Sequence, residues 1–308
     1  MSESQFQNFN HLKIHSQYSI CEGAIKIDDL QDFSKSNKIK SLALCDTKNL
    51  CGALEFAEKI SKVGTQPIIG TQINFKFGDI IGLLPLFSLN EEGYKRIIKL
   101  SSVSFLENDE LSVPHVDFNN LLEDNSGVAI FSGTVFGLFG ELFNKGKFSE
   151  LHDLYKKLSS SFGDRFYIEI QRHNDQNEIV FEKFNLKKSL ELKIPLIATN
   201  EVFYLDQDMH EAHDALLCIG NKTYVNEKAR IKLSNQHYLK THLEMSQLFA
   251  DLPEALENNY NFPLRCNFRP LFSNPILPNI SSEKGGNADD VLKKDSLHGL
   301  KIKFNKIF

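Results

Sequence analysis

Tryptophan is absent from the chain, and cysteine is scarce, with five among 308 residues. The number of cysteines is odd, and no two of them form a CxxC pair. This pattern argues against both a disulfide framework and a zinc ribbon. We therefore expect free thiols in a reducing compartment at Cys21, Cys45, Cys51, Cys218 and Cys266.

The sequence also lacks long apolar runs and an excess of basic residues. Its N-terminus is polar, without the apolar segment of a signal peptide. The most apolar run, Ile80–Phe87, is far shorter than the roughly 20 residues that span a bilayer. The formal net charge of −5 gives no overall attraction to DNA phosphates. We expect a cytoplasmic protein with no membrane contact, and we expect that this part of the protein does not itself bind DNA.

What the sequence does contain is short apolar runs that alternate with longer amphipathic stretches. Several of the runs are continuously apolar, as strands buried on both faces are. This alternation predicts an α/β fold with parallel strands, either a barrel or an open sheet. The predicted strands are His11–His15, Ser41–Cys45, Pro67–Phe75, Ile80–Phe87, Val128–Phe131, Phe166–Ile170 and Pro195–Ala198. The predicted helices between them are Ile27–Ser36, Leu50–Val63, Glu91–Ser104 and Glu178–Leu192.

The character of the sequence changes after Ala198. Residues 206–262 are predicted to be mostly helical, and a proline-containing loop follows from Asn267. The segment SSEKGGN has the composition of a linker, and Ala288–Phe304 is predicted to form one more helix.

Polar residues follow several predicted strands, where parallel α/β folds place their chemistry. Those of metal-ligand type are His15, Asp46, His173 and Glu201, a mixture that suits zinc or manganese. However, an aspartate after a strand is usually a helix cap or turn residue, and a histidine there can be a hydrogen-bonded core residue. These four residues do not form an HxH or HxxxH pair with one another, so their spacing alone favours the structural alternatives.

Segments along the whole chain resemble, in order, the N-terminal region of the bacterial replicative DNA polymerase III alpha subunit family. In that family this region is a PHP (polymerase and histidinol phosphatase) domain, a distorted parallel α/β barrel with metal ligands at its strand ends. The resemblance implies a distorted parallel (β/α)7-like barrel followed by a helical extension. The segments that carry it include HLKIHSQYSICEGAIKIDDL, LALCDTKNLCGALEFAEKISKVGTQPIIGTQINF, FYIEIQRHNDQ, IPLIATNEVFYLDQDMHEAHDALLCIGNKTYVNE and ADDVLKKDSLHGL.

The resemblance also implies a domain division. Residues 1–280 would form the PHP domain, and residues 281–308 a linker and the first helix leading to a polymerase core. We expect the chain to stop before that core, as a truncated form. The aspartates that hold the catalytic magnesium ions belong to the core in this family.

Compared with the metal-binding members, this chain has lost ligands in its first two motifs. The family's HLHxHS is HLKIHS here, so Lys13 stands at the first ligand position and only His15 remains. A protonated lysine cannot bind a metal, and its charge repels one. The family's TDHGNLFG is CDTKNLCG here, which keeps Asp46 but places Thr47 at a histidine position.

The later motifs show the same loss. Gln72 replaces the carboxylate of IIGCE, and Leu83 falls where a histidine is expected. Thr134 stands in place of the cysteine of LSGC. ATNDVHY is ATNEVFY here, so Glu201 can still bind a metal but Phe203 cannot.

Three family ligands, His15, Asp46 and Glu201, therefore remain, and they are too few for a metal cluster that activates water. We expect no cofactor in this part of the protein and at most weak binding of zinc or manganese. An introduced lysine, such as Lys13, is a candidate to pair with Asp46 or Glu201 and replace the charge of the metal.

The function that the resemblance implies is that of a non-catalytic scaffold. It would stabilise the polymerase core of the same chain and dock a proofreading exonuclease subunit, with DNA reached through the parent holoenzyme. The parent activity would be DNA-directed DNA synthesis. The alternatives are a metal-dependent PHP phosphoesterase or 3′–5′ exonuclease, and a free-standing PHP phosphatase. The sequence after residue 205 resembles the polymerase family and disfavours the last alternative.

Overall fold

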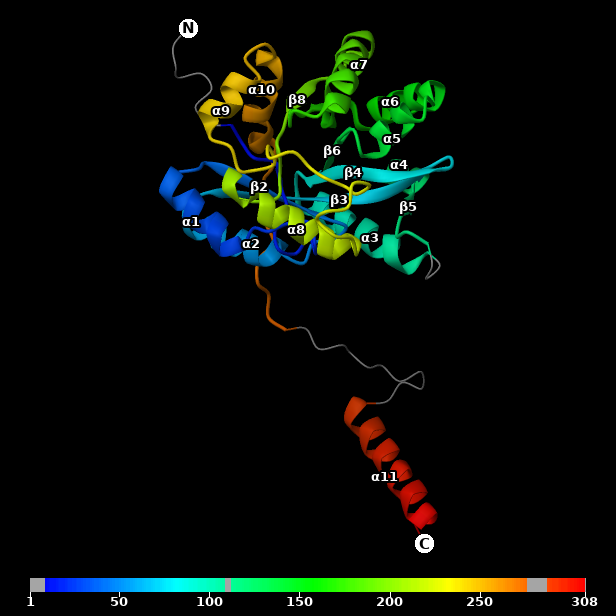
Figure 1. The fold of residues 1–308 in the computed structure, drawn as a ribbon. Coiled ribbons are helices and arrows are strands. Elements are labelled where there is room, and N and C mark those ends of the chain that lie inside the picture. The colour runs from blue at the N-terminus through cyan, green and yellow to red at the C-terminus, as the bar shows by residue number, and fades with distance from the viewer. Residues whose placement is uncertain (1–8, 109–111, 276–286, 308) are drawn as a thin grey trace. The chain divides into compact units, whose positions relative to one another are not determined.

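The computed structural model of the protein describes residues 9–108, 112–275 and 287–307, in two compact units that divide between Leu271 and Phe272 (Figure 1). The strands of the first unit are β1 (Lys13–Ile14), β2 (Ser41–Thr47), β3 (Gln66–Phe77), β4 (Ile80–Ser88), β5 (Val116–Asp117), β6 (Val128–Phe131), β7 (Phe166–Ile170), β8 (Leu196–Ala198) and β9 (Glu201–Val202). Its α-helices are α1 (Ile27–Asn37), α2 (Ala53–Lys62), α3 (Glu91–Leu106), α4 (Phe118–Glu123), α5 (Leu138–Asn144), α6 (Phe148–Phe162), α7 (Gln176–Leu192), α8 (His210–Asn221), α9 (His242–Leu248) and α10 (Pro253–Asn261). Short 3-10 helices are η1 (Gly163–Arg165), η2 (Gln207–Met209) and η3 (Phe262–Arg265).

The strands form one curled sheet in the order β8-β7-β6-β4-β3-β2-β1-β9, with β5 paired to β3. The predicted α/β fold is confirmed, and most neighbouring strands are parallel. The exception is β4, which runs antiparallel to both β3 and β6. The two residues between β3 and β4, Gly78 and Asp79, allow only a hairpin, and Gly78 supplies the positive φ of 62° that such a tight turn needs.

Residues 196–202 bring the two ends of the sheet together. The first part of this segment, β8, pairs in parallel with β7, whereas its last part, β9, pairs in parallel with β1 at the other end of the strand order. One kinked segment thus links both edges of the curled sheet. As a result, side chains from β1, β7 and β9 meet inside the barrel.

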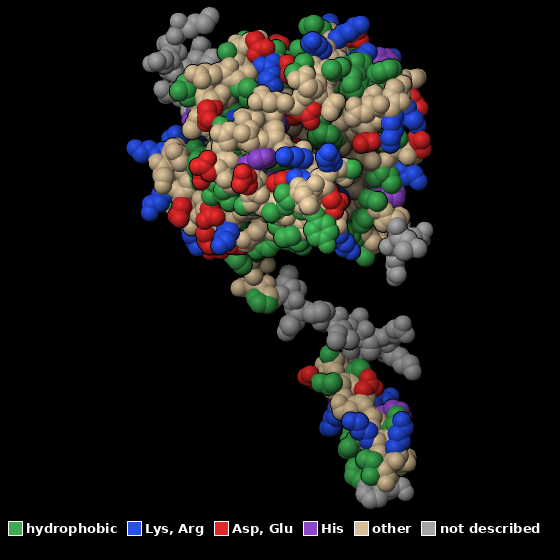
Figure 2. Space-filling view, viewed as in Figure 1, with side chains coloured by type: hydrophobic (Ala, Val, Ile, Leu, Met, Phe, Trp, Pro, Cys, Tyr) green, Lys and Arg blue, Asp and Glu red, His purple; other side chains and the backbone are tan. Residues whose placement is uncertain are grey.

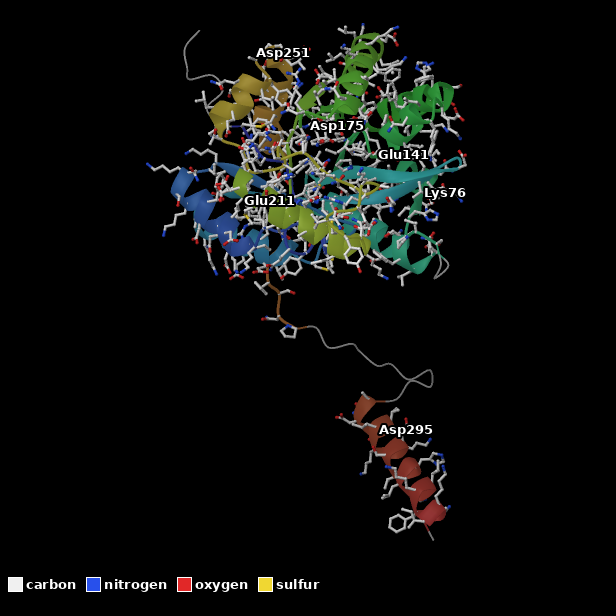
Figure 3. All side chains as sticks on the ribbon, in the orientation of Figure 1. Lys76, Glu141, Asp175, Glu211, Asp251 and Asp295 are labelled. Atoms are coloured by element: carbon white, nitrogen blue, oxygen red, sulfur yellow. The ribbon has the colours of Figure 1, made fainter. Side chains whose placement is uncertain are left out.

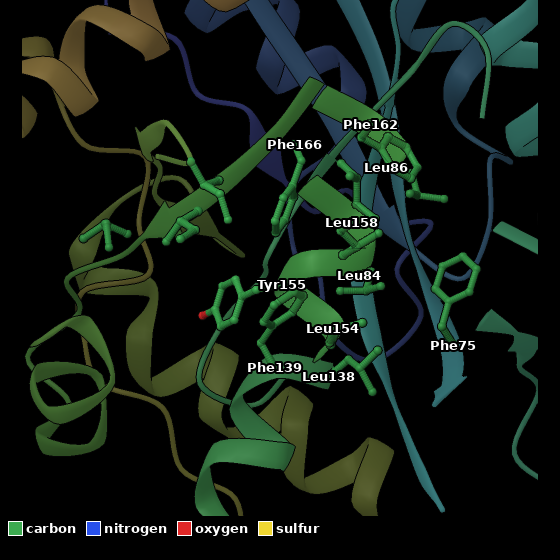
Figure 4. Packing of buried hydrophobic residues seen from close by; sticks show 14 of the residues in the cluster. Phe75, Leu84, Leu86, Leu138, Phe139, Leu154, Tyr155, Leu158, Phe162 and Phe166 are labelled. Atoms are coloured by element: carbon green, nitrogen blue, oxygen red, sulfur yellow. The ribbon is translucent and has the colours of Figure 1, made fainter. Parts of the chain in front are cut away.

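The helices pack against the outside of the sheet. Along α6 the buried residues follow the 3–4 spacing of an amphipathic helix: Leu151, Leu154, Tyr155, Leu158 and Phe162. Figure 4 shows part of this cluster, in which Tyr155 packs edge-on against Phe139 at 4.6 Å between ring centroids.

Aromatic rings line one part of the barrel interior. Phe262 of η3 lies against Phe87, Phe131 and Tyr167, with ring centroids 5.1 to 5.9 Å apart. A side chain at Gly70 of β3 would lie 2.6 Å from the Phe87 ring, so the close approach of this ring requires glycine there. Aromatic rings therefore fill this part of the barrel interior.

The surface carries acidic and basic side chains interspersed over the face shown in Figure 2, as the 35 basic and 40 acidic residues of the chain predict. The second unit contains α11 (Ala288–Ile307), which includes the whole of the predicted helix Ala288–Phe304. The predicted linker before it falls mostly outside the described residues. None of the helices that the structure describes has the length and the apolar character needed to cross a bilayer.

Asn259 of α10 ties the N-terminal segment to the sheet and generates a first prediction. Its side chain is fully buried, accepts a hydrogen bond from the Asn10 backbone N–H (2.8 Å) and donates to the backbone carbonyls of Asn10 and Ala198 (2.8 and 2.9 Å). Asn259→Ala would leave these groups unpaired, so we expect it to lower the free energy of unfolding by about 2–4 kcal/mol. Urea unfolding measures this change. The exposed Glu257→Ala on the same helix is the control, and equal effects of the two changes would contradict the assigned role.

Candidate functional site

A cavity of about 650 Å³ opens at the end of the barrel where the parallel strands finish. Seven of the nine positions taken from the family motifs line it: His15, Thr47, Gln72, Leu83, Thr134, Glu201 and Phe203. The other two, Lys13 and Asp46, are buried behind its wall.

Lys13 lies fully buried between two carboxylates. Its Nζ is 3.2 Å from Oε1 of Glu201 and 3.5 Å from Oε1 of Glu169, and its side chain has no exposed surface. β1, β9 and β7 supply these three groups, so the contact depends on the way residues 196–202 join the ends of the sheet. Of the two partners considered from the sequence, Glu201 is the one that an introduced lysine contacts.

Oε1 of Glu201 is surrounded by further donors. The Gln72 amide donates to it at 2.7 Å, and Nε2 of His15 lies 3.1 Å from it. Together with Lys13, these groups occupy the positions around the oxygen that a metal ion would need. The Gln72 side-chain amide is thus a neutral hydrogen-bond donor at the position where the resembled family motif has a carboxylate.

The opposite charges in this cluster stabilise the ionised forms of one another. Burial alone would lower the pKa of Lys13, but the nearby Glu169 and Glu201 carboxylates outweigh it and raise that pKa above its ordinary value. Burial alone would raise the pKa of Glu201, but Lys13 and His15 hold it well below its usual range. Lys13 is therefore an ammonium, and Glu201 is a carboxylate, at neutral pH.

Glu169 is the central residue that the sequence analysis missed. Its Oε1 accepts hydrogen bonds from Thr199 and, at 2.8 Å, from Gln171, whereas its Oε2 is buried without a hydrogen-bond partner among the described residues. A usable signal was present: Glu169 is a charged residue within the apolar run FYIEI, as Lys13 is within HLKIH. Charged residues are almost never fully buried unless paired, so each of these two positions implied a buried partner of opposite charge.

Asp46 serves a different purpose. Its Oδ1 accepts from the Ser16 backbone N–H and from the Ser19 hydroxyl, both at 2.7 Å, and its Oδ2 accepts from the Ser16 hydroxyl at 2.9 Å. The carboxylate thus fixes the turn after β1. The helix cap considered for it from the sequence is not formed, because the N-cap of α2 is Gly52 and has no side-chain hydrogen bond. The structure also does not bring Asp46 into the cluster around Glu201.

The remaining substituted positions present neutral groups. Thr47 bonds to Nδ1 of His15 at 3.2 Å, and Phe203 stacks on the His15 ring with centroids 4.5 Å apart. Leu83 of β4 and Thr134 after β6 line the cavity wall. Around His15, then, a hydroxyl and a phenyl ring stand where metal-binding members have histidines.

His173, the further candidate, lies beside this cluster. Its Nδ1 is 2.8 Å from Glu178, its Nε2 accepts from the Glu201 backbone N–H at 3.2 Å, and its ring stacks on His237 with centroids 4.0 Å apart. Both ring nitrogens therefore have protein partners. Burial and the neighbouring His173 hold the pKa of His237 well below its ordinary value, so His237 is neutral at pH 7.

The residues present do not fit a metal cluster. Within the described ranges, no three His, Cys, Asp or Glu side chains are grouped so that they could hold one ion. The place beside Glu201 that a cation would take already holds the Lys13 ammonium. The geometry supports electrostatic stabilisation of the barrel.

Comparison with protein families shows a match to the PHP domain over residues 11–173. Related proteins include the DNA polymerase III subunit alpha of Caulobacter vibrioides, 34% identical over 98% of this chain, and that of Rickettsia conorii, 38% identical over 95%. The protein of the same name from Borreliella burgdorferi is 33% identical over 97% of this chain. The chain spans only 25 to 27% of the length of these relatives.

Among solved structures, the chain is similar to an amidohydrolase from Chromobacterium violaceum, with 11% identity and a TM-score of 0.41. It is also similar to a putative metal-dependent phosphoesterase from Bifidobacterium adolescentis, with 10% identity and a TM-score of 0.36. Each match covers 63% of this chain and 87% of the other chain.

The family match covers more than half of the chain and contains the Lys13 and Glu169 positions of the buried cluster. The relatives extend the similarity to nearly its full length. The chain belongs to the PHP domain family, and relatives that match it over almost its whole length are alpha subunits of DNA polymerase III.

Proposed function

We propose that this chain is the N-terminal portion of a DNA polymerase III alpha subunit and that its PHP domain is a non-catalytic scaffold. The observation that carries this proposal is the Lys13 ammonium, held between Glu169 and Glu201 at the former metal site. A fixed internal cation of this kind supplies the charge that a metal ion would supply, without exchangeable ligands. The domain would then support the rest of the polymerase through its fold alone.

The wider setting belongs to the same proposal. The parent protein would carry out DNA-directed DNA synthesis in the cytoplasm, with magnesium bound in a polymerase core beyond this chain. DNA would be reached through that core and the holoenzyme. The net charge of −5 supports this division of roles, because an acidic module has no overall attraction to phosphates.

A proofreading exonuclease subunit is the proposed docking partner, on the basis of the alpha-subunit family that the chain resembles. We expect the 308-residue chain to bind its cognate exonuclease subunit, because the scaffold role includes docking. Co-elution in size-exclusion chromatography measures this binding, and the exonuclease with an unrelated acidic protein is the control. Separate elution of the two proteins at micromolar concentrations would refute docking through this part of the chain.

Metal content tests the absence of catalysis. We expect the chain, purified without chelator and then given zinc and manganese, to retain less than a stoichiometric amount of either metal. Elemental analysis measures this content. Lys13→His is the matched variant, and we expect it to take up more zinc, since it removes the ammonium and restores an HxH pair with His15. Stoichiometric, tightly held metal in the unaltered chain would instead favour a metal-dependent phosphoesterase or 3′–5′ exonuclease.

Removal of the internal cation tests the structural role. Lys13→Met keeps a similar shape but leaves two buried carboxylates without their ammonium, so we expect the free energy of unfolding to fall by about 3–5 kcal/mol. Urea unfolding at pH 7 measures the change. Lys48→Met is the control, because Lys48 is partly exposed and forms no ion pair among the described residues. Equal stability of the two variants would refute the structural role.

The pH dependence gives a second readout of the same change. Lys13 helps to hold the pKa of Glu201 well below 4.5, so its contribution is complete above pH 4.5 and is lost as pH falls through the lower folded-state value. The raised pKa of Lys13 keeps the same contribution intact up to at least pH 10.5, with loss only above it. The stability gap between the natural chain and Lys13→Met should therefore be widest near neutral pH and shrink in acid. A gap that widens in acid would contradict the ion-pair mechanism.

A further inference from the structure

The cavity at the strand ends keeps the size and lining of a ligand site. Its volume of about 650 Å³ lies within the usual range for small-molecule pockets, roughly 300–1,000 Å³. Its floor is polar, with Gln72 and Glu201, and its walls include apolar side chains from separate elements. The walls are formed partly by Ile20, Leu83, Phe136, Phe203, Leu217 and Leu233.

The charges around this cavity are unbalanced. Among the described lining residues, the carboxylates are Glu22, Glu141, Glu178 and Glu201, whereas Lys232 is the one lysine or arginine. Glu141, marked on α5 in Figure 3, pairs with Lys145 at 3.2 Å, but that pair is largely exposed and therefore weak. Glu22 is half-buried and forms no ion pair among the described residues. The cavity thus presents an excess of negative charge.

The buried cluster behind the floor does not offset this excess, because the charges that it adds to the lining residues, those of Lys13 and Glu169, cancel. Lys13 carries one positive charge, whereas its two partners, Glu169 and Glu201, carry two negative charges. Oε2 of Glu169 has no exposed surface and no hydrogen-bond partner among the described residues. Glu169 faces a void of about 10 Å³ that shares Thr134, Gln171 and Glu178 with the lining of the large cavity. The void lined by Glu169 and the large cavity are therefore neighbours.

We propose that this cavity binds an organic cation, a protonated amine on an aliphatic stem. The ammonium would be attracted by the other lining carboxylates, Glu22, Glu141 and Glu178, and the stem would lie along the apolar walls. The Phe203 and Phe136 rings are suitable for cation–π contacts. This inference rests on the proposed function, since it requires that no metal cluster takes up the same negative charge.

Two sources share this ligand chemistry, a free aliphatic amine and a lysine side chain of a peptide. The probes are pentylammonium with the neutral 1-pentanol, and acetyl-Ala-Lys-Ala-amide with the same peptide carrying norleucine in place of lysine. Calorimetric titration of the 308-residue chain at low salt measures their affinities. We expect each cationic probe to bind about tenfold more tightly than its neutral counterpart, which corresponds to about 1.4 kcal/mol. Tighter binding of pentylammonium identifies a free amine as the source, and tighter binding of the lysine peptide identifies a protein side chain.

Substitutions of residues that line the cavity test whether the cationic probes bind there. Glu22→Gln and Glu141→Gln lie outside the Lys13 cluster and should each weaken the cationic probes about threefold, whereas Lys232→Met should strengthen them. Glu254→Gln, an exposed change on α10, is the control and should leave the affinity unchanged. Circular dichroism checks that each variant is folded. Equal affinities for the charged and neutral probes, or binding that none of the cavity variants alters, would overturn the inference.

The same samples separate this inference from the proposed function. Titrations are repeated on protein treated with EDTA, while the metal content of the untreated protein is measured. Stoichiometric metal in the untreated protein would refute the scaffold proposal, whatever the amines do. Failure of the amines to bind the EDTA-treated protein would refute this inference alone.

Discussion

The buried ammonium of Lys13, fixed between Glu169 and Glu201, is the interaction on which the site depends. An ion pair buried in this way carries a large desolvation cost, and it is tolerated only when the partner charges are close and hydrogen-bonded. Here the carboxylates also accept hydrogen bonds from Gln72, Gln171 and Thr199. The three charges come from strands at both ends of the sheet, so the ion pairs form only when residues 196–202 have joined those ends.

This constraint decides what the end of the barrel can do chemically. A metal site needs carboxylates and imidazoles with free lone pairs, whereas Oε1 of Glu201 is already surrounded by Lys13, His15 and Gln72. Asp46, the other retained carboxylate, is engaged with Ser16 and Ser19. The surviving ligand types are thus used to hold the protein together. The open cavity nevertheless persists above them, with its polar floor and apolar walls.

Much of the fold could be predicted from local pattern. The 3–4 spacing of apolar residues along α6 follows from burial of one face of the helix. The mostly apolar runs at β2, β3 and β7 follow from burial of both faces of the sheet. Both patterns can be recognised in residues that are close together in the sequence. The four-residue gap between the predicted strands Pro67–Phe75 and Ile80–Phe87 also implied a hairpin, although the expectation of parallel strands overlooked it. Of the nine positions taken from the motifs of the resembled family, seven line the cavity.

The sequence by itself determined the α/β fold and which polar residues follow its strands. It also placed single charges, Lys13 and Glu169, in otherwise apolar strands, which required that each find a buried partner. Only the tertiary structure decided that Lys13 pairs with Glu201 and Glu169, and that Asp46 holds the turn after β1 instead. The reason is physical: strand burial is set by residues near in sequence, whereas the choice of ion partner depends on how a kinked segment closes the sheet.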